Sequence, residues 1–194
     1  MRSVIILAGC ILLTATGYAQ HPIRFRSTEW LGLSSGQAGS AVELQTVNGV
    51  SAGPWFLGAG AGIDYYRFRS VPLFVSATRD LTLSKKDGLL LFFDWGTNVP
   101  WYTAPAADQY GNNATIKFHS GYYLSTGIGY LFKLDERGRR AVVLSAGYSE
   151  KKISEVVADV PQMCPIEGVC MIDQQKTAFA YLNRMFRFMV GFRF

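Results

Sequence analysis

The chain has 194 residues and a formal net charge of +5; 49% of its residues are hydrophobic and only 17% are charged. A chain so apolar is not intrinsically disordered. After the first nineteen residues no apolar run reaches the roughly 18 residues of a spanning helix. The small positive charge is spread along the sequence and does not indicate a nucleic-acid partner. The abundance of Gly, Tyr and Phe without a spanning helix is instead typical of a membrane β-barrel.

The first segment has the three parts of a secretory signal peptide. Arg2 supplies the positive charge, an apolar stretch runs from Val4 to Leu13, and Ala19 is a small residue at the expected cleavage position. We therefore expect a cleaved signal peptide at 1–19, followed by one barrel domain at 20–194. Two alternatives are less favoured: a lipoprotein cysteine at Cys10, which would follow too short an apolar run, and an uncleaved anchor, for which the run is too short to cross a bilayer.

The remaining chain shows an apolar–polar alternation of period two, which predicts β-strands. In residues 55–65, for example, Trp55 and Leu57 share one face, and glycines and Asp64 share the other. Segments with the same pattern are 71–83, 89–98, 121–134, 141–151 and 186–194. Segments 23–33 and 40–47 are weaker candidates, and the pattern does not determine which of Trp30 and Leu31 faces inward. The total predicts an all-β fold: a single eight-stranded antiparallel up-and-down transmembrane β-barrel.

The expected connections are asymmetric. If both chain ends lie on the periplasmic side, three short polar turns fall near Asn48–Gly49, at 85–88 and at 135–139. The outer connections fall near 34–38, 67–71, 98–116 and 152–178, so both long loops lie on the same side. Short periplasmic turns and long external loops distinguish outer-membrane barrels from soluble ones.

The last nine residues carry the most specific resemblance. They alternate apolar with other residues, include Phe188 and Phe192, and finish on Phe194. This segment resembles the C-terminal assembly signal of small Gram-negative outer-membrane β-barrel proteins. The resemblance implies a location in the outer membrane, contact with outer-membrane lipid, and recognition by the barrel-insertion machinery during assembly.

Charged residues on the inward faces are expected to fill the lumen. Counting along alternating strand directions places Glu43, Asp94 and Arg187 near mid-height, and we predict that they form a lumen charge plug. The same count places Asp80, Lys133 and Arg193 toward the periplasm, and Asp64 and Lys151 toward the outside. An eight-stranded interior is only wide enough for side chains, and buried charges persist when paired, so a closed lumen is favoured over a solute path.

The cysteines predict a disulfide rather than a metal site. Once the signal peptide is removed, Cys164 and Cys170 remain as an even pair in an oxidising compartment. Zinc binding is disfavoured because His21 and His119 lie far away in sequence and no second cysteine pair exists. No cofactor-binding or metal-binding motif is present in the sequence.

The sequence offers no convincing catalytic constellation. The one nearby pair, His119–Ser120, consists of adjacent residues that point to opposite faces of a strand. No G-x-S-x-G elbow occurs. We therefore expect a structural or surface-interaction role through the long external loops, with an extracellular ligand that the sequence does not identify. The alternatives are a lipid-modifying outer-membrane enzyme, a narrow channel and a soluble periplasmic lipid-binding barrel.

Overall fold

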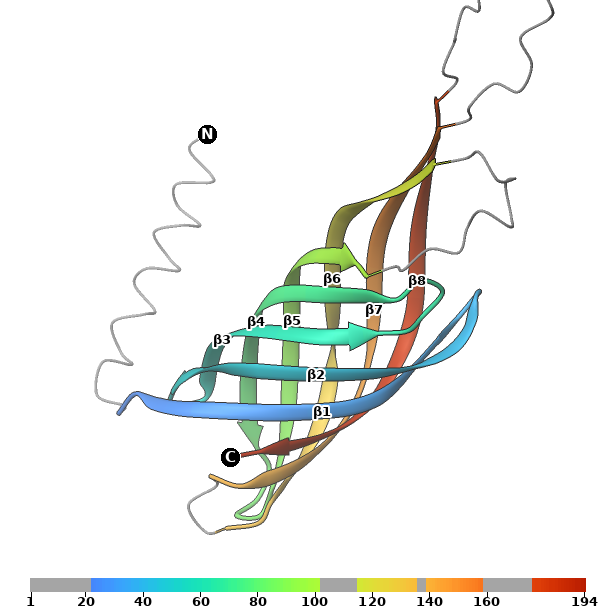
Figure 1. The fold of residues 1–194 in the computed structure, drawn as a ribbon. Coiled ribbons are helices and arrows are strands. Elements are labelled where there is room, and N and C mark those ends of the chain that lie inside the picture. The colour runs from blue at the N-terminus through green and yellow to red at the C-terminus, as the bar shows by residue number, and fades with distance from the viewer. Residues whose placement is uncertain (1–21, 102–114, 136–138, 159–175) are drawn as a thin grey trace, which may run out of the picture.

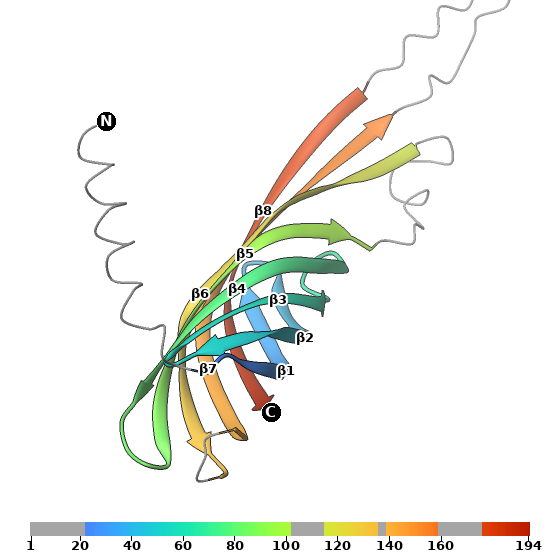
Figure 2. The same cartoon turned by 90° about the vertical axis from the view of Figure 1, so that its left-hand side faces the viewer.

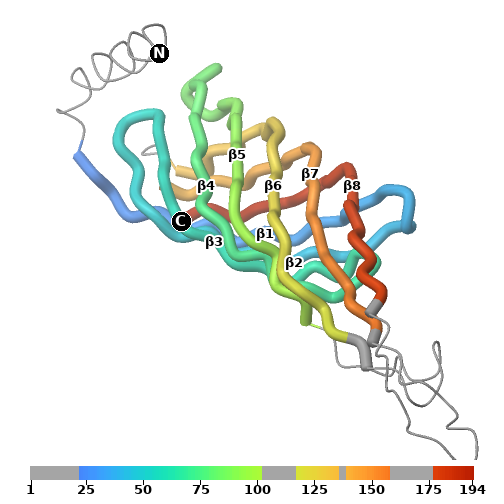
Figure 3. Tube along the Cα trace, turned by 90° about the horizontal axis from the view of Figure 1, so that it is seen from above, coloured from blue at the N-terminus to red at the C-terminus, as the bar shows by residue number. Residues whose placement is uncertain are grey.

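A computed structural model describes residues 22–101, 115–135, 139–158 and 176–194, which form one closed antiparallel sheet (Figure 1). The strands are β1 (Arg24–Gly36), β2 (Gly39–Ala52), β3 (Trp55–Asp64), β4 (Ser70–Thr82), β5 (Asp87–Pro100), β6 (Thr115–Lys133), β7 (Ala141–Ala158) and β8 (Lys176–Arg193). Each strand pairs with the next, and β8 pairs with β1, closing the barrel (Figure 3). The predicted eight-stranded fold is confirmed. In these ranges no helix is long and apolar enough to cross a membrane.

The two faces of the wall follow the alternation in the sequence. Large apolar side chains point outward, as shown by Leu57 (59% exposed) and Phe188 (62% exposed), while Asp64 and Arg187 are buried inside. A soluble lipid-binding barrel would need these apolar side chains in its interior, and the structure contradicts that alternative. The outer face is a continuous apolar surface of the kind that bilayer hydrocarbon solvates.

An apolar layer in the interior shows which face of β1 points inward, a question that the sequence left open. Trp30 points inward and Leu31 outward. Trp30 packs against two buried clusters, one containing Phe56 and Phe74 and the other containing Leu90 and Leu131. Leu90 therefore interrupts the alternation of β5 because the lumen at its level is filled by hydrocarbon rather than by polar groups.

The predicted turn at Asn48–Gly49 is wrong, since both residues lie within β2. The chain instead turns at Gly53, whose φ of +58° is accessible to glycine, and at Pro54. Gly49 is required for another reason: it pairs with Gly58, and a Cβ at Gly49 would lie 2.2 Å from the Leu57 carbonyl oxygen. Because Gly49 has no side chain, β2 and β3 can approach closely at this point; the residue does not form a turn.

The strands also extend into the predicted loops 98–116 and 152–178. β7 continues to Ala158, β6 begins at Thr115 and β8 at Lys176, so the connections shorten to 101–114 and 159–175. These three strands project beyond the other five (Figures 1 and 2). We call this side of the barrel the loop end, and the opposite side, with the connections 53–54, 83–86 and 134–140, the turn end.

A register shift between Ser120 and Tyr123 marks the base of the projection. One extra residue in β6 reverses which residues face inward: Tyr123 faces the lumen below the shift, and Phe118 faces the same side as its buried partner Glu155 above it. The simple alternation that predicts the membrane-spanning part therefore fails to extend through this segment.

Candidate functional site

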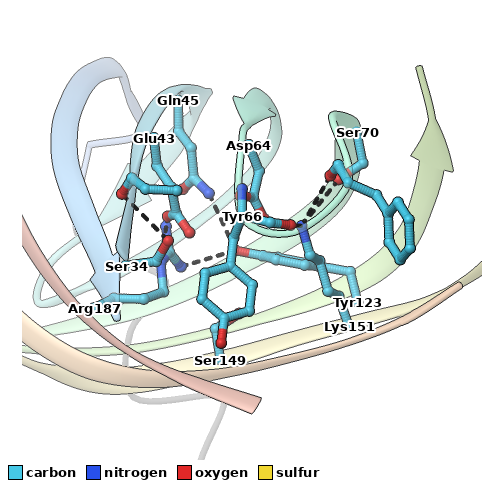
Figure 4. Close-up of polar contacts among 12 residues, drawn as sticks. Ser34, Glu43, Gln45, Asp64, Tyr66, Ser70, Tyr123, Ser149, Lys151 and Arg187 are labelled. Atoms are coloured by element: carbon cyan, nitrogen blue, oxygen red, sulfur yellow. Dashed lines mark hydrogen bonds and ion pairs between the residues drawn. The ribbon is translucent and has the colours of Figure 1, made fainter. Parts of the chain in front are cut away.

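The centre of the lumen is filled by a polar network around Arg187 of β8 (Figure 4). The Arg187 Nε donates to Glu43 Oε2 of β2 at 2.7 Å, and Nη1 donates to Tyr123 Oη at 2.8 Å and Ser125 Oγ at 2.7 Å, both on β6. Gln45 Nε2 also donates to Tyr123 Oη at 3.1 Å. The side chains of Arg187 and Glu43 are only 2% and 3% exposed. One guanidinium thus connects β8 with β2 and β6 across the interior of the barrel.

Of the three residues predicted as a lumen plug, two are in direct contact. Arg187 pairs with Glu43, whereas Asp94 lies across from Ser76 on the neighbouring strand and is hydrogen-bonded to it. Asp94 is buried and faces the same interior. The sequence count did not anticipate that Tyr123 and Ser125 would accept the hydrogen bonds of Arg187 Nη1.

A second network closes the loop end of the lumen. Lys151 Nζ of β7 donates to Asp64 Oδ2 at 2.6 Å, to the Tyr66 carbonyl oxygen at 2.8 Å and to Ser70 Oγ at 3.2 Å (Figure 4). Lys151 is fully buried. These contacts fasten the connection between β3 and β4 to the opposite wall of the barrel.

Tyr66 completes this closure. Its backbone N–H donates to Asp64 Oδ1 at 2.7 Å, and its hydroxyl accepts a hydrogen bond from the Ala38 N–H at 2.8 Å. Tyr66 is 2% exposed. The side chain therefore reaches from the β3–β4 connection to the β1–β2 turn, over the mouth of the lumen. Gly36 leaves room for it, because a Cβ there would lie 2.5 Å from the tyrosine oxygen.

A third ionic layer lies at the turn end. Arg193 Nη1 donates to Asp80 Oδ2 at 2.6 Å, and Arg26 Nη1 donates to the same oxygen at 3.1 Å. Arg26 Nη2 donates to Thr78 Oγ1 at 2.6 Å. Two cations therefore share one carboxylate, an excess of positive charge that the other two layers do not have.

Between the central network and the ionic layer at the turn end, side chains fill the interior almost completely. The apolar clusters around Trp30 occupy this level, and a cavity of about 30 Å³ is the space between them and Asp94. Such a volume is comparable to the share of one liquid water molecule. The lumen therefore alternates polar and apolar layers along its height.

Within the described ranges, no group of three or more His, Cys, Asp and Glu side chains is placed to hold a metal ion. His119 and Ser120 lie on β6 in the projection, across from Ser154 and Ile153 respectively, and both are exposed. Neither contacts the buried networks.

Several predicted residues have other outcomes. Lys133 is only half-buried. Phe188, Phe192 and Phe194 all point outward from the final strand, as the alternation requires. Cys164 and Cys170, together with the signal segment, lie outside the described residues, so the disulfide stays a prediction.

Sequence reasoning missed Arg26, Tyr66 and Tyr123 as members of these networks. Arg26 lies four residues before Trp30 on the same strand, so both side chains are on one face of that strand. Knowing that Trp30 faces inward would therefore have identified Arg26 as a lumen residue. The parity of Tyr123 was visible, but its role depends on contacts with residues that lie more than 60 positions away in sequence. Tyr66 lies in a connection, where alternation gives no signal.

No protein-family model and no curated protein sequence matches the chain. Among solved structures, the crystal structure of Neisserial surface protein A (NspA) is similar, with a TM-score of 0.51 and 13% identity over 88% of this chain and 95% of that one. The outer membrane protein OprG from Pseudomonas aeruginosa gives a TM-score of 0.45 and 12% identity over 90% and 96%. The expected resemblance to small outer-membrane barrels is confirmed at the level of the fold.

Proposed function

We propose that this chain is an outer-membrane barrel whose lumen is closed to solutes and whose function lies in interactions at its loop end. The apolar outer wall supports membrane insertion, and the likeness in fold to a neighbour described as a surface protein supports the location. In this orientation the projection of β6, β7 and β8 is presented outside the cell, where it would meet an extracellular ligand.

The closure of the lumen carries the proposal. Arg187 with Glu43 and Lys151 with Asp64 each span the interior, and Tyr66 covers the loop end above them. A continuous wet path would have to pass both pairs and then the apolar layer around Trp30. Buried pairs of this kind are costly to separate, so they act as fixed barriers rather than as gates.

Single-channel recording in a planar bilayer tests the closure. We expect no steady current from the wild-type protein. A Trp30→Ala variant with Phe74→Ala removes apolar filling while keeping every ion pair, and it serves as a comparison for leakage through an enlarged interior. Steady conductance of the wild-type protein would overturn the closed lumen and favour the narrow-channel alternative.

Orientation is tested with the protein's own cysteines, because Cys164 and Cys170 belong to the connection at the loop end. After mild reduction of intact cells, a membrane-impermeant maleimide should label these thiols. As a matched control, Lys85→Cys in a background lacking both native cysteines places one thiol in a connection at the turn end and should react only after permeabilisation. The reverse pattern of labelling would contradict the proposed orientation.

The non-enzymatic role rests on the same arrangement. The buried groups around Arg187 and Lys151 donate to and accept from one another, and His119 lies apart from them at an exposed position on β6. A lipid-modifying enzyme would need a reactive group with a base and an orienting carboxylate at the outer rim. If purified protein altered the acyl chains of lipid A or phospholipid in vesicles, and His119→Ala abolished the change, the enzyme alternative would replace this proposal.

A further inference from the structure

The turn end of the barrel opens into a cavity of about 590 Å³ that is rich in arginine. Its lining includes Arg24, Arg26, Arg139 and Arg193, and its acidic side chain is Asp80. Even when the main-chain carboxylate of Phe194 is counted, cations outnumber anions in the lining. The charge of this cavity is unlike that of the rest of the lumen, where each buried cation has its own carboxylate.

Two of these arginines are buried in the floor of the cavity. Arg26 and Arg193 are 9% and 5% exposed, and both also line the small void above. The guanidinium carbon of Arg26 lies over the ring of Phe56, 3.9 Å from its centroid. The stacking on Phe56 and the shared bonds to Asp80 fix the orientation of these guanidinium groups.

Their hydrogen bonding is incomplete. The terminal nitrogens of both side chains are used by Asp80 and Thr78. The Nε of Arg26 and the Nε of Arg193 are both buried and have no acceptor among the described residues. A buried charged donor without an acceptor is costly, and nearly all such groups in folded proteins are paired.

We propose that this cavity binds a phosphate group. A phosphate carries several acceptor oxygens and up to two negative charges, which match the excess of guanidinium groups in the lining of the cavity. Arg24 and Arg139 are exposed at the mouth, where they attract the anion and contact its outer oxygens. Two sources have this chemistry: free inorganic phosphate, and the headgroup of a phospholipid in the leaflet beside the turn end.

Titration calorimetry with inorganic phosphate, on protein folded in a neutral detergent, measures the site directly. We expect saturable binding to one site. Arg24→Gln and Arg139→Gln should each weaken it about twofold to fivefold, as for exposed ion pairs. Arg193→Gln should weaken it about tenfold or more, as for a buried charge-assisted bond. Asp80→Asn should tighten it, because the carboxylate that competes for the same guanidinium groups is neutralised.

Arg79→Gln is the matched control. Arg79 precedes Asp80 on β4 but faces outward, with its guanidinium 5.0 Å from the Trp55 ring centroid, so the same charge is lost at the same height on the other side of the wall. Its phosphate affinity should equal that of the wild type. Absence of saturable binding, equal effects of Arg24→Gln, Arg139→Gln and Arg79→Gln, or loss of binding in Asp80→Asn would each overturn the site. If Arg193→Gln does not fold, Arg24→Gln and Arg139→Gln still test the site, because both residues are exposed at the mouth of the cavity.

A second arm separates the two sources. The same titration is repeated in nanodiscs containing phosphatidylglycerol. An unchanged affinity for inorganic phosphate identifies the free anion as the ligand. An affinity that falls in the nanodiscs, and recovers in neutral detergent, identifies the lipid headgroup as the occupant.

Discussion

The substitution Arg187→Met measures how much the ion pair between Arg187 and Glu43 contributes to the stability of the barrel. The substitution keeps an unbranched side chain in the lumen but leaves Glu43 buried at 2% exposure without its partner, and removes the donor to Tyr123 and Ser125. Breaking a buried pair by removing one partner costs about 3–5 kcal/mol. At about 1.4 kcal/mol per factor of ten, the ratio of folded to unfolded protein should fall by roughly two to four orders of magnitude.

The assay is urea unfolding in lipid vesicles followed by tryptophan fluorescence, since Trp30 lies in the adjoining apolar layer. Combining Arg187→Met with Glu43→Leu removes both charges and should recover most of the lost stability, because an apolar pair of similar volume is often neutral. Arg184→Met is the matched control: Arg184 is also on β8 and pairs with Glu150 at 3.0 Å, but it is 64% exposed. Its loss should cost about 1 kcal/mol or less.

The reasoning fails if Arg187→Met costs no more than Arg184→Met, or if the double variant is as unstable as Arg187→Met alone. The second result would mean that packing around the guanidinium, rather than the stranded carboxylate, determines the loss. If Arg187→Met alone does not fold, recovery of folding in the double variant supports the same conclusion.

Three other outcomes are expected. Ile128→Arg and Leu144→Arg, on the outward face, should each destabilise the barrel by about 2–4 kcal/mol in vesicle unfolding if they lie near the bilayer midplane, and unchanged stability in both would contradict membrane insertion. Lys151→Met should release the β3–β4 connection and speed tryptic cleavage after Arg67 and Arg69, whereas Lys152→Met, the exposed neighbour, should not. Deleting Phe194 should lower the amount of barrel assembled in cells more than it lowers the stability of protein already folded, and equal cellular yields would argue against an assembly signal.

The heights of the buried charges were predictable because the topology is simple. In an up-and-down barrel each strand reverses direction, so the level of a residue follows from counting along the chain. That count placed Asp64 with Lys151 and Asp80 with Arg193, and the structure shows both pairs in contact. The alternation of residues also assigned the faces of six strands, because most inward positions are small, polar or charged; Phe56, Phe74, Leu90 and Leu131 are inward-facing exceptions.

The features that escaped prediction depend on local backbone geometry or on distant partners. The register shift at 120–123 inserts one residue, and nothing in the sequence Gly121–Tyr122 distinguishes it from regular strand. The projection was missed because the recognised alternation in this part of the chain covered only residues 141–151, although β7 continues to Ala158. Trp30 was ambiguous because arginines precede it, and an arginine is compatible with either the lumen or the membrane rim.

The interior pairs also determine the register of the strands. Each pair joins residues distant in sequence: Glu43 and Arg187 are 144 positions apart, Asp80 and Arg193 are 113, and Asp64 and Lys151 are 87. A slip of one residue is already forbidden, because it would turn every charge toward lipid. A slip of two residues keeps all faces correct, and the alternation of apolar and polar residues cannot oppose it. Such a slip would, however, set the charges at different heights and leave them buried and unpaired, at several kcal/mol for each pair. The layered charges therefore select one closed barrel among the registers that the hydrophobic pattern permits.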